Sequence, residues 1–452
     1  MIATVVIASR LCHSSVLWAD DNLPLAAAME IARGKALYRD VWFDKPPLVA
    51  WACLLWGAHA GVWLRLAGAA YVIAVALAAR QLARARWGEL EGLFAAGLAA
   101  FFLTFGLPSG VIPLASDMLL VLPHLIAVYL AWRGRAFLSG MAAGIGLLCS
   151  AKAVFVLVAC AVWQWRQLPF LVAGFALPQA VALGWMWLLG SAGEYYRQAW
   201  QWGTIYAANT FVEHPLVEGV RRTLDWLGFQ AALLVGVILA FARDRLRRDA
   251  LWIVLSLAGV GLGLRFFPRY YLLLLPAMTI TAARGWALFT RNRVATAGLA
   301  LLLVVPLVRF GPRYITLARG GTWSDLSIDR DSRAAAAKLG AFAQPGDTLF
   351  VWGFRPDIFI DSGLPSGTRF LESQPISGVL ADRHLFSNQA VAPEFIAPNR
   401  RELLTTQPTW VVDGLGLYNP ALAVARQEEL APWFAQYSEV ARTDFSILYH
   451  HR

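Results

Sequence analysis

The sequence predicts a polytopic α-helical membrane protein that ends in a smaller α/β domain outside the membrane. Of its 452 residues, 58% are hydrophobic and 15% are charged, whereas soluble domains are about 45–50% apolar and about 25% charged. The apolar residues form long runs, as membrane-spanning helices of about 20 residues require. From residue 316 onward these runs give way to a mixed-charge sequence with alternating helix and strand patterns. We therefore predict a membrane domain at 1–315 and an extracytoplasmic domain at 316–452.

The net charge of +10 is unevenly distributed along the chain. Residues 316–452 hold 12 Lys and Arg against 15 Asp and Glu, so the basic surplus belongs to the membrane half. Lys and Arg in short loops orient the spans of a membrane protein. We therefore expect no nucleic-acid partner.

Eleven apolar segments are candidate spans. They are 2–18, 63–80, 91–107, 113–132, 137–150, 153–165, 168–190, 227–242, 250–265, 271–288 and 294–310. The segments 137–150 and 153–165 are short for two spans, and they could instead form one long helix. Eleven spans with a cytoplasmic N-terminus make every inside turn basic, as the positive-inside rule requires. Ten spans would move Arg243–Arg248 and Arg291–Arg293 outside, so we favour eleven.

This topology brings most polar segments to one outer side of the membrane. The outer segments are 19–62, 108–112, 151–152, 191–226, 266–270 and the tail from 316. Three charged residues near span ends, Asp117, Lys152 and Arg269, are predicted on the same side. The first external loop, about 19–62, is dense in charge for a membrane protein, and we expect the functional site there.

Two acids, Asp20 and Asp21, stand where the first span ends. They could simply end the span and stabilise the N-terminus of the next helix, predicted at Leu23–Arg33. Carboxylates buried at the membrane interface are also suited to general-base chemistry. Asp40 and Asp44, later in the same loop, are further candidates for the site.

Several basic residues could bind an anion at this surface. Lys45, one of only four lysines, precedes Pro46-Pro47, and its compact ammonium suits a phosphate oxygen. Lys152 lies between two apolar helices, although Lys at such a place can also extend to the interface as an anchor. Arg269, beside Tyr270, lies on the outer side against the positive-inside bias, which favours an anion-binding role.

No metal signature accompanies these residues. Asp20, Asp21 and Asp117 could hold a divalent cation, but no His/Cys spacing and no other known metal or nucleophile motif is present. An ionisable residue near the end of a span, such as Asp117, is a functional candidate by default. The sequence assigns no metal ligand and no certain cofactor, and it leaves a divalent cation open.

The tail is expected to alternate helix and strand. "DRDSRAAAAKLGAFAQPGDTLFVWG" predicts a helix capped by Ser332, a Pro-Gly turn and a strand. "PTWVVDGLG" predicts a second strand, Ala421–Phe434 a helix, and "DFSILYH" a closing strand. Such alternation favours a small α/β domain.

Four stretches together resemble the GT-C superfamily of membrane glycosyltransferases. They are the acidic pair with Gly34 fourteen residues after Asp20, followed by "YRDVWFDKPPL"; "ASDMLL"; "GLLCSAK"; and "FFPRYYLLLLP". The chain is most similar to family-39-like bacterial relatives of protein O-mannosyltransferases and of the lipid A aminoarabinose transferase. The family commonly has Glu at the position of Asp21 and His at the position of Arg269. The match covers roughly residues 15–290.

The resemblance implies an inverting glycosyltransferase that uses a polyprenyl-phosphate-linked sugar, either a hexose or a pentose. Asp20 would be the catalytic base toward an acceptor hydroxyl of a glycan, lipid or protein, and Lys45, Lys152 and Arg269 would bind the donor phosphate. The implied location is the bacterial inner membrane, with the site and the tail on the extracytoplasmic side. The alternatives are a transporter or flippase for a lipid-linked anion and a non-catalytic assembly protein. A transporter would be expected to have internal repeats, and none is evident.

Overall fold

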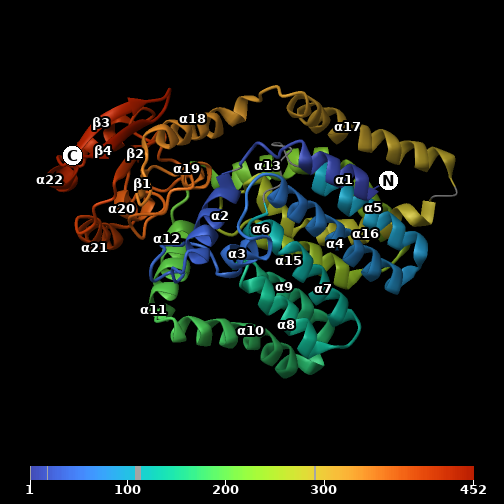
Figure 1. Cartoon of the computed structure of the whole chain (residues 1–452). Coiled ribbons are helices and arrows are strands. Elements are labelled where there is room, and N and C mark those ends of the chain that lie inside the picture. The colour runs from blue at the N-terminus through green and yellow to red at the C-terminus, as the bar shows by residue number, and fades with distance from the viewer. Residues whose placement is uncertain (1, 18, 107–113, 290–291) are drawn as a thin grey trace.

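The computed structural model describes residues 2–17, 19–106, 114–289 and 292–452. A large bundle of helices holds the first two thirds of the chain, and a unit with a small sheet covers one end of it (Figure 1). Parts of the predicted spans 2–18, 91–107 and 113–132, and the predicted outer segment 108–112, lie outside the described residues. The bundle helices are α1 Ile2–Leu11, α2 Ala19–Ala32, α3 Leu48–Trp51, α4 Val62–Trp87, α5 Glu89–Phe105, α6 Ser116–Leu119, α7 Val121–Trp132, α8 Ala136–Leu147, α9 Ala153–Gln164, α10 Leu168–Leu188, α11 Ala192–Tyr195, α12 Trp202–Ala208, α13 Pro215–Phe229, α14 Ala231–Arg243, α15 Arg247–Val260, α16 Leu275–Phe289 and α17 Arg293–Ala318.

Apolar helices occupy the described part of every predicted span, but their lengths differ. By length and composition, α4, the run Ala153–Leu188 and α17 could each cross a membrane, and α13 with α14, bent by 88°, would make a fourth crossing among the described residues. The segments 137–150 and 153–165 form two helices, α8 and α9, rather than one long helix. The total of eleven crossings stays a prediction.

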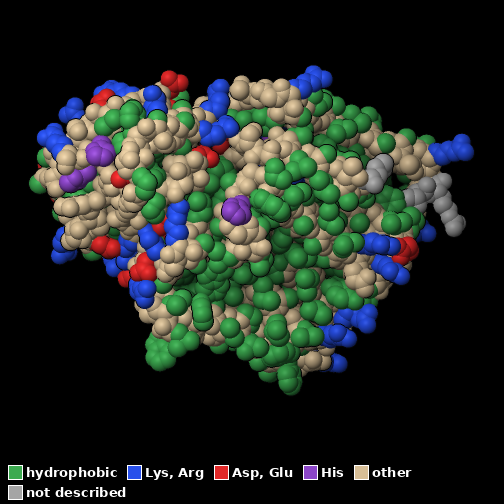
Figure 2. Space-filling model, viewed as in Figure 1, with side chains coloured by type: hydrophobic (Ala, Val, Ile, Leu, Met, Phe, Trp, Pro, Cys, Tyr) green, Lys and Arg blue, Asp and Glu red, His purple; other side chains and the backbone are tan. Residues whose placement is uncertain are grey.

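A broad apolar surface covers the bundle (Figure 2). In that view, Lys, Arg, Asp and Glu gather over the C-terminal unit at one end, and further basic side chains gather at the opposite edge. Exposed apolar side chains on α4, α10 and α17, such as Leu77, Val181 and Leu301, belong to helices that the sequence predicts as spans. Such a surface is what lipid contact requires.

Glycines allow close approach of helices inside the bundle. A Cβ at Gly285 on α16 would lie 1.8 Å from the carbonyl oxygen of Gly236 on α14, and one at Gly140 on α8 would lie 2.0 Å from the carbonyl oxygen of Leu171 on α10. No larger residue fits at either glycine without moving a helix. Small residues at such contacts are typical of membrane bundles.

The C-terminal unit contains the predicted α/β elements in part. Helix α18, Ser327–Phe342, is followed by α19 Asp357–Ser362, α20 Gln374–Ser377, α21 Pro393–Leu403 and α22 Ala431–Phe434. The strands are β1 Leu349–Trp352, β2 Trp410–Asp413, β3 Tyr437–Arg442 and β4 Ile447–His451. Their order is β1-β2-β4-β3, with β1 and β2 parallel and the other pairs antiparallel. The predicted boundary at 316 falls in the last turn of α17.

Three details of the tail differ from the prediction. Ala421–Phe434 is not one helix, because backbone N–H groups of Leu415, Gly416 and Val424 bind the buried carboxylate of Asp413 and hold the chain in 3₁₀ turns before α22. The strand β3 was not predicted. Ser332 does not cap α18, because the helix begins five residues earlier and the buried Ser332 hydroxyl accepts hydrogen bonds from Arg355.

The tail is fastened to the bundle by buried polar contacts. Arg265 Nε donates to Asp382 Oδ2 over 2.8 Å, and both side chains are at most 5% exposed. The backbone N–H of Trp42 donates to the carbonyl of Arg369 over 2.7 Å. The stretch 19–62 is therefore covered on one side by the C-terminal unit.

Candidate active site

The first turn of α2 places Asp20 against a cation from a distant segment. Arg269 donates from one guanidinium nitrogen to Asp20 Oδ2 over 2.8 Å. Its Nε also lies 3.8 Å from Asp117 Oδ2, so one arginine is shared by two carboxylates. The side chains of Asp20 and Arg269 are 21% and 35% exposed, which leaves the pair accessible.

Asp117 is also bound by Lys152. The ammonium donates to Asp117 Oδ1 over 2.7 Å and lies 3.1 Å from the centroid of the Tyr270 ring. Lys152 directly precedes α9, and Asp117 lies in the first turn of α6. Four separate segments therefore meet through these side chains.

The backbone before Arg269 is constrained. The 3₁₀ turn Pro268–Leu273 starts with proline, which fixes its own φ. Just before it, Leu264 and Phe266 have φ of 53° and 49°, a region that large L-residues rarely occupy and that is enriched near functional sites. Arg269 and Tyr270 therefore follow a short segment whose backbone has little conformational freedom.

Asp21 has different surroundings from Asp20. Its Oδ2 accepts from Arg65 over 3.1 Å and its Oδ1 from the backbone N–H of Leu114 over 2.7 Å. Arg65 also donates to the carbonyls of His13 and Val16. Burial raises the pKa of Asp21, while Arg65 and the Leu114 amide oppose that shift. The geometry makes Asp21 an anchor that joins α4, the end of α1 and the chain before α6.

Lys45 lies near the cluster without touching it. Its ammonium binds Asp44 over 3.0 Å, and it is 39% exposed. Partial burial acts to lower the pKa of Lys45, but Asp44, Tyr206 and Asp20 outweigh it and raise the pKa. Its direct partner is thus Asp44, and Asp20 acts on it only as a more distant charge.

Asp40 is separate from this group. Its carboxylate accepts from Arg39 and from the Ala36 amide, and Arg39 in turn donates to the carbonyl of Leu189. The pair is largely exposed, at 53% and 34%. Of the predicted site residues, the structure thus gathers Asp20, Asp117, Lys152, Arg269 and Tyr270, places Asp44 and Lys45 beside them, and places Asp21 and Asp40 elsewhere.

Four residues of this region were not among the predicted site residues: Arg65, Tyr206, Glu372 and Asp382. Glu372 comes from the tail, and burial, together with Asp44, raises its pKa to about 8. Tyr206 lies beneath the Arg265 guanidinium, 3.8 Å from ring centroid to carbon. Of these four, only Arg65 could have been found from the sequence. It lies in the predicted span 63–80, and a charge inside a span is costly unless it has a partner.

No group of three or more His, Cys, Asp or Glu side chains suited to a metal ion occurs within the described ranges. The two carboxylates that lie closest to the cations, Asp20 and Asp117, are already bound by Arg269 and Lys152. The arrangement is chemically suited to an anion that competes with these carboxylates for the two cations.

No protein-family model matches the sequence, and no curated protein sequence matches it. Among solved structures, ArnT from Cupriavidus metallidurans bound to undecaprenyl phosphate matches over 99% of this chain and 96% of that chain, with a TM-score of 0.64 and 14% identity. The chain has the fold of ArnT. The apo state of ArnT matches over the same shares with a TM-score of 0.62 and 16% identity.

ArnT is a GT-C glycosyltransferase, so the resemblance predicted from the sequence is confirmed at the level of the fold. A weaker similarity, with a TM-score of 0.45 and 11% identity, connects the chain to the oligosaccharyltransferase AglB from Archaeoglobus fulgidus, over 97% of this chain and 72% of that one.

Proposed function

We propose that this protein is an inverting glycosyltransferase that moves a hexose or pentose from a polyprenyl phosphate to an acceptor hydroxyl. The reaction would occur at the extracytoplasmic side of a bacterial inner membrane. The observation that carries the proposal is the shared arginine: Arg269 binds Asp20 and also lies near Asp117, beside Lys152. The ArnT fold and the undecaprenyl phosphate bound in one ArnT structure agree with a lipid phosphate as the donor group.

The donor phosphate would bind by exchanging partners with the carboxylates. A phosphate oxygen can compete with Asp20 and Asp117 for Arg269 and Lys152, because Arg and Lys form charge-assisted hydrogen bonds to phosphate as they do to carboxylate. Lys45, on its flexible stem, would add a third cation from the first loop. Once Arg269 contacts phosphate, Asp20 loses its positive partner and becomes more basic.

The transfer step then follows from the positions of these groups. Asp20 removes the proton of the acceptor hydroxyl, and the acceptor oxygen forms a bond to the anomeric carbon. The bond between that carbon and the phosphate oxygen breaks, and the lipid phosphate leaves with the electron pair. Arg269 and Lys152 stabilise the charge that develops on the leaving phosphate. Such electrostatic stabilisation is usually the largest contribution to the rate enhancement of an enzyme.

A transfer assay in lipid nanodiscs tests this proposal. The protein receives a panel of polyprenyl-phosphate-linked sugars and a native membrane extract as acceptor, and wild type is compared with Asp20→Asn and with the control Asp40→Asn. We expect donor consumption by wild type and Asp40→Asn only. If Asp20→Asn consumed as much donor as wild type, the protein would still be a glycosyltransferase, but Asp20 would not be its general base. If wild type and both variants bound the donor but none consumed it, the result would favour a transporter or flippase for a lipid-linked anion.

A further inference from the structure

Helix α13, Pro215–Phe229, carries an exposed apolar row beside a charged one. Four large apolar side chains, each between 61% and 72% exposed, lie on one face because they recur at helical spacing: Leu216, Val217, Val220 and Leu224. The neighbouring face carries three charged residues: Glu218, Arg221 and Asp225. This pattern is typical of a helix in the interface of a membrane, with its apolar side among the lipid chains and its charges in water.

The direction of α13 agrees with a position along the membrane surface. It meets α14 at an angle of 88°, so the two helices cannot both run along the membrane normal. α14 is apolar up to Arg243 and packs inside the bundle, where its Gly236 lies against Gly285 of α16. α13 has four charged residues among its fifteen, and charge is costly inside hydrocarbon. The bend therefore suits a crossing by α14 and a surface position for α13.

The inner face of α13 contacts the chain just after Arg269. The Thr223 hydroxyl lies 2.8 Å from the Tyr271 hydroxyl, within hydrogen-bond distance. One turn further along α13, the Trp226 ring stacks on the Tyr271 ring, with 5.1 Å between the centroids and 16° between the planes. Two side chains of α13 thus hold a residue that is two positions from Arg269.

The same face also contacts the chain just before Arg269. Arg222 donates to the carbonyl of Arg265 over 2.7 Å. A Cβ at Gly219 would lie 2.5 Å from the ring of Phe266, so the glycine leaves room for that ring. Phe266 has a φ of 49°, and such a conformation persists only where the surroundings hold it. α13 therefore fixes the backbone on both sides of Arg269.

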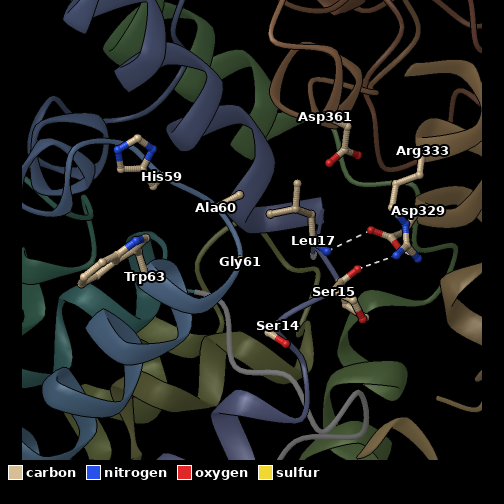
Figure 3. Close-up of a pocket in the computed structure, with 11 residues that line it drawn as sticks. Ser14, Ser15, Leu17, His59, Ala60, Gly61, Trp63, Asp329, Arg333 and Asp361 are labelled. Atoms are coloured by element: carbon tan, nitrogen blue, oxygen red, sulfur yellow. Dashed lines mark hydrogen bonds and ion pairs between the residues drawn. The ribbon is translucent and has the colours of Figure 1, made fainter. Parts of the chain in front are cut away.

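The carboxylate that Arg269 binds is held from a different direction. Three residues before Asp20, the backbone N–H of Leu17 donates to Asp329 Oδ1 over 2.9 Å (Figure 3). Asp329 lies on α18 of the tail. The tail thus fixes the chain that leads to Asp20, whereas α13 fixes the chain that carries Arg269.

We propose that α13 is a membrane-surface helix that positions Arg269 for the donor phosphate. Its apolar face contacts the lipid chains of the leaflet on the side of the site, and Gly219, Thr223 and Trp226 are positioning residues on its inner face. The inference rests on the proposed function, which it deepens. Lipid fits the apolar face because this face continues into α14, which is predicted to span the membrane. Since the phosphate of a polyprenyl phosphate lies at the same interface, a surface helix keeps Arg269 at the depth of that phosphate.

Spin-label depth in nanodiscs tests the surface position without any donor. Single cysteines replace Val220 on the apolar face and Asp225 on the charged face of the full chain. The background is Cys12→Ser, because the other three cysteines are buried. Each nitroxide label is exposed to oxygen, which is enriched in lipid, and to a water-soluble nickel chelate.

We expect the label at Val220→Cys to be reached by oxygen and shielded from nickel, and the label at Asp225→Cys to be reached by nickel. Nickel access at Val220→Cys would place the apolar face in water and overturn the surface position. Shielding of that label from both reagents would also overturn it, because a protein partner or a second copy of the chain would then cover the face.

The positioning role is measured by titration with a polyprenyl phosphate and with the sugar-loaded donor. Thr223→Val removes the hydroxyl contact with Tyr271, Thr223→Ser keeps it, and Gly219→Val displaces the ring of Phe266. The matched control is Thr204→Val, because the exposed Thr204 hydroxyl donates to a carbonyl one turn earlier in the chain. Dissociation constants for the polyprenyl phosphate, donor KM, acceptor KM and kcat are compared with those of wild type.

We expect Thr223→Val and Gly219→Val to weaken binding of the polyprenyl phosphate and to raise the donor KM by about two- to tenfold, the range of one neutral hydrogen bond. The acceptor KM should not change. Thr223→Ser and Thr204→Val should match wild type. If Gly219→Val does not fold, the comparison of Thr223→Val with Thr223→Ser decides the question.

Unchanged binding of the polyprenyl phosphate in Thr223→Val would reject the positioning role, and normal transfer by that variant would leave the proposed function intact. An equal loss in Thr223→Ser and Thr223→Val would also reject the role, because the hydroxyl would then not be its cause. If wild type bound the polyprenyl phosphate and the variants lost affinity as expected, but no donor was consumed, the proposed function would fail while the role of α13 would stand.

Discussion

Asp20 and Asp21 are neighbours in the chain, yet they serve different regions of the molecule. Asp20 faces Arg269, is 21% exposed, and shares its partner with Asp117. Asp21 is fully enclosed, and both of its oxygens are bound, by Arg65 and by the Leu114 amide. The first arrangement can be opened by a competing anion, whereas the second is closed. Under the proposed function, Asp20 takes part in the reaction, whereas the neighbouring Asp21 stabilises the fold.

The largest expected effect on activity is that of Asp20→Asn. Loss of a general base lowers kcat about 10²–10⁴-fold, and donor affinity should be retained because Arg269 and Lys152 remain. Since Asp117 stays near Arg269, the unfolding temperature should hardly move. Single-turnover transfer, donor binding and thermal unfolding in nanodiscs measure the three quantities. If the kcat of Asp20→Asn fell only a few-fold below that of wild type, Asp20 would not be the general base.

Asp21→Asn should act mainly on stability. The substitution leaves the buried Arg65 without its anion, and breaking a buried pair costs about 3–5 kcal/mol. Thermal unfolding in nanodiscs and expression level measure this effect. The double variant Asp21→Leu/Arg65→Met is the control, since removing both charges should recover part of the loss. If the Asp21→Asn variant were folded and as stable as wild type but showed no transfer, Asp21 would instead be a second residue that takes part in the reaction.

Lys45→Ala should weaken use of the donor by a smaller factor. One charge-assisted hydrogen bond is worth about 1.5–3 kcal/mol, which corresponds to a rise in donor KM of about 10–100-fold. Lys45→Arg keeps the charge and should recover part of the affinity. Donor titrations at saturating acceptor give the measurement, and an unchanged donor KM would exclude Lys45 from the site.

The smallest effect should follow Asp40→Asn. Its partner Arg39 is mostly exposed, and solvent screens such surface pairs. Transfer rate and unfolding temperature should both match wild type within experimental error. A large loss of transfer would show that the exposed end of the first loop contacts a substrate.

Local patterns in the sequence predicted much of this architecture. Apolar runs predicted the positions of the long helices, and the positive-inside rule predicted Asp20, Asp117, Lys152 and Arg269 on one side of the membrane. In the structure these four side chains lie together. The first-loop helix predicted at Leu23–Arg33 is present as α2, which starts at Ala19 because Asp20 and Asp21 stabilise its first turn.

Other features depend on partners that are remote in the sequence. Nothing local to Asp21 indicates Arg65 or Leu114, and nothing local to Asp44 indicates the nearby Glu372 of the tail. In the tail, Asp413 overrides the helical pattern of Ala421–Phe434 by binding three backbone N–H groups.

The pairing of Asp20 with Arg269 has a consequence for biosynthesis. The two residues are 249 positions apart, and at about 5–20 residues per second the ribosome would deliver the arginine roughly 12–50 s after the aspartate. The contact of Leu17 with Asp329 forms later still, across 312 positions. Until these residues have been synthesised, the first loop lies at the membrane surface without Arg269 and Asp329. Under the proposed function, a nascent or truncated chain that ends before Arg269 would lack a cation of the site and would be inert toward the lipid-linked sugars around it.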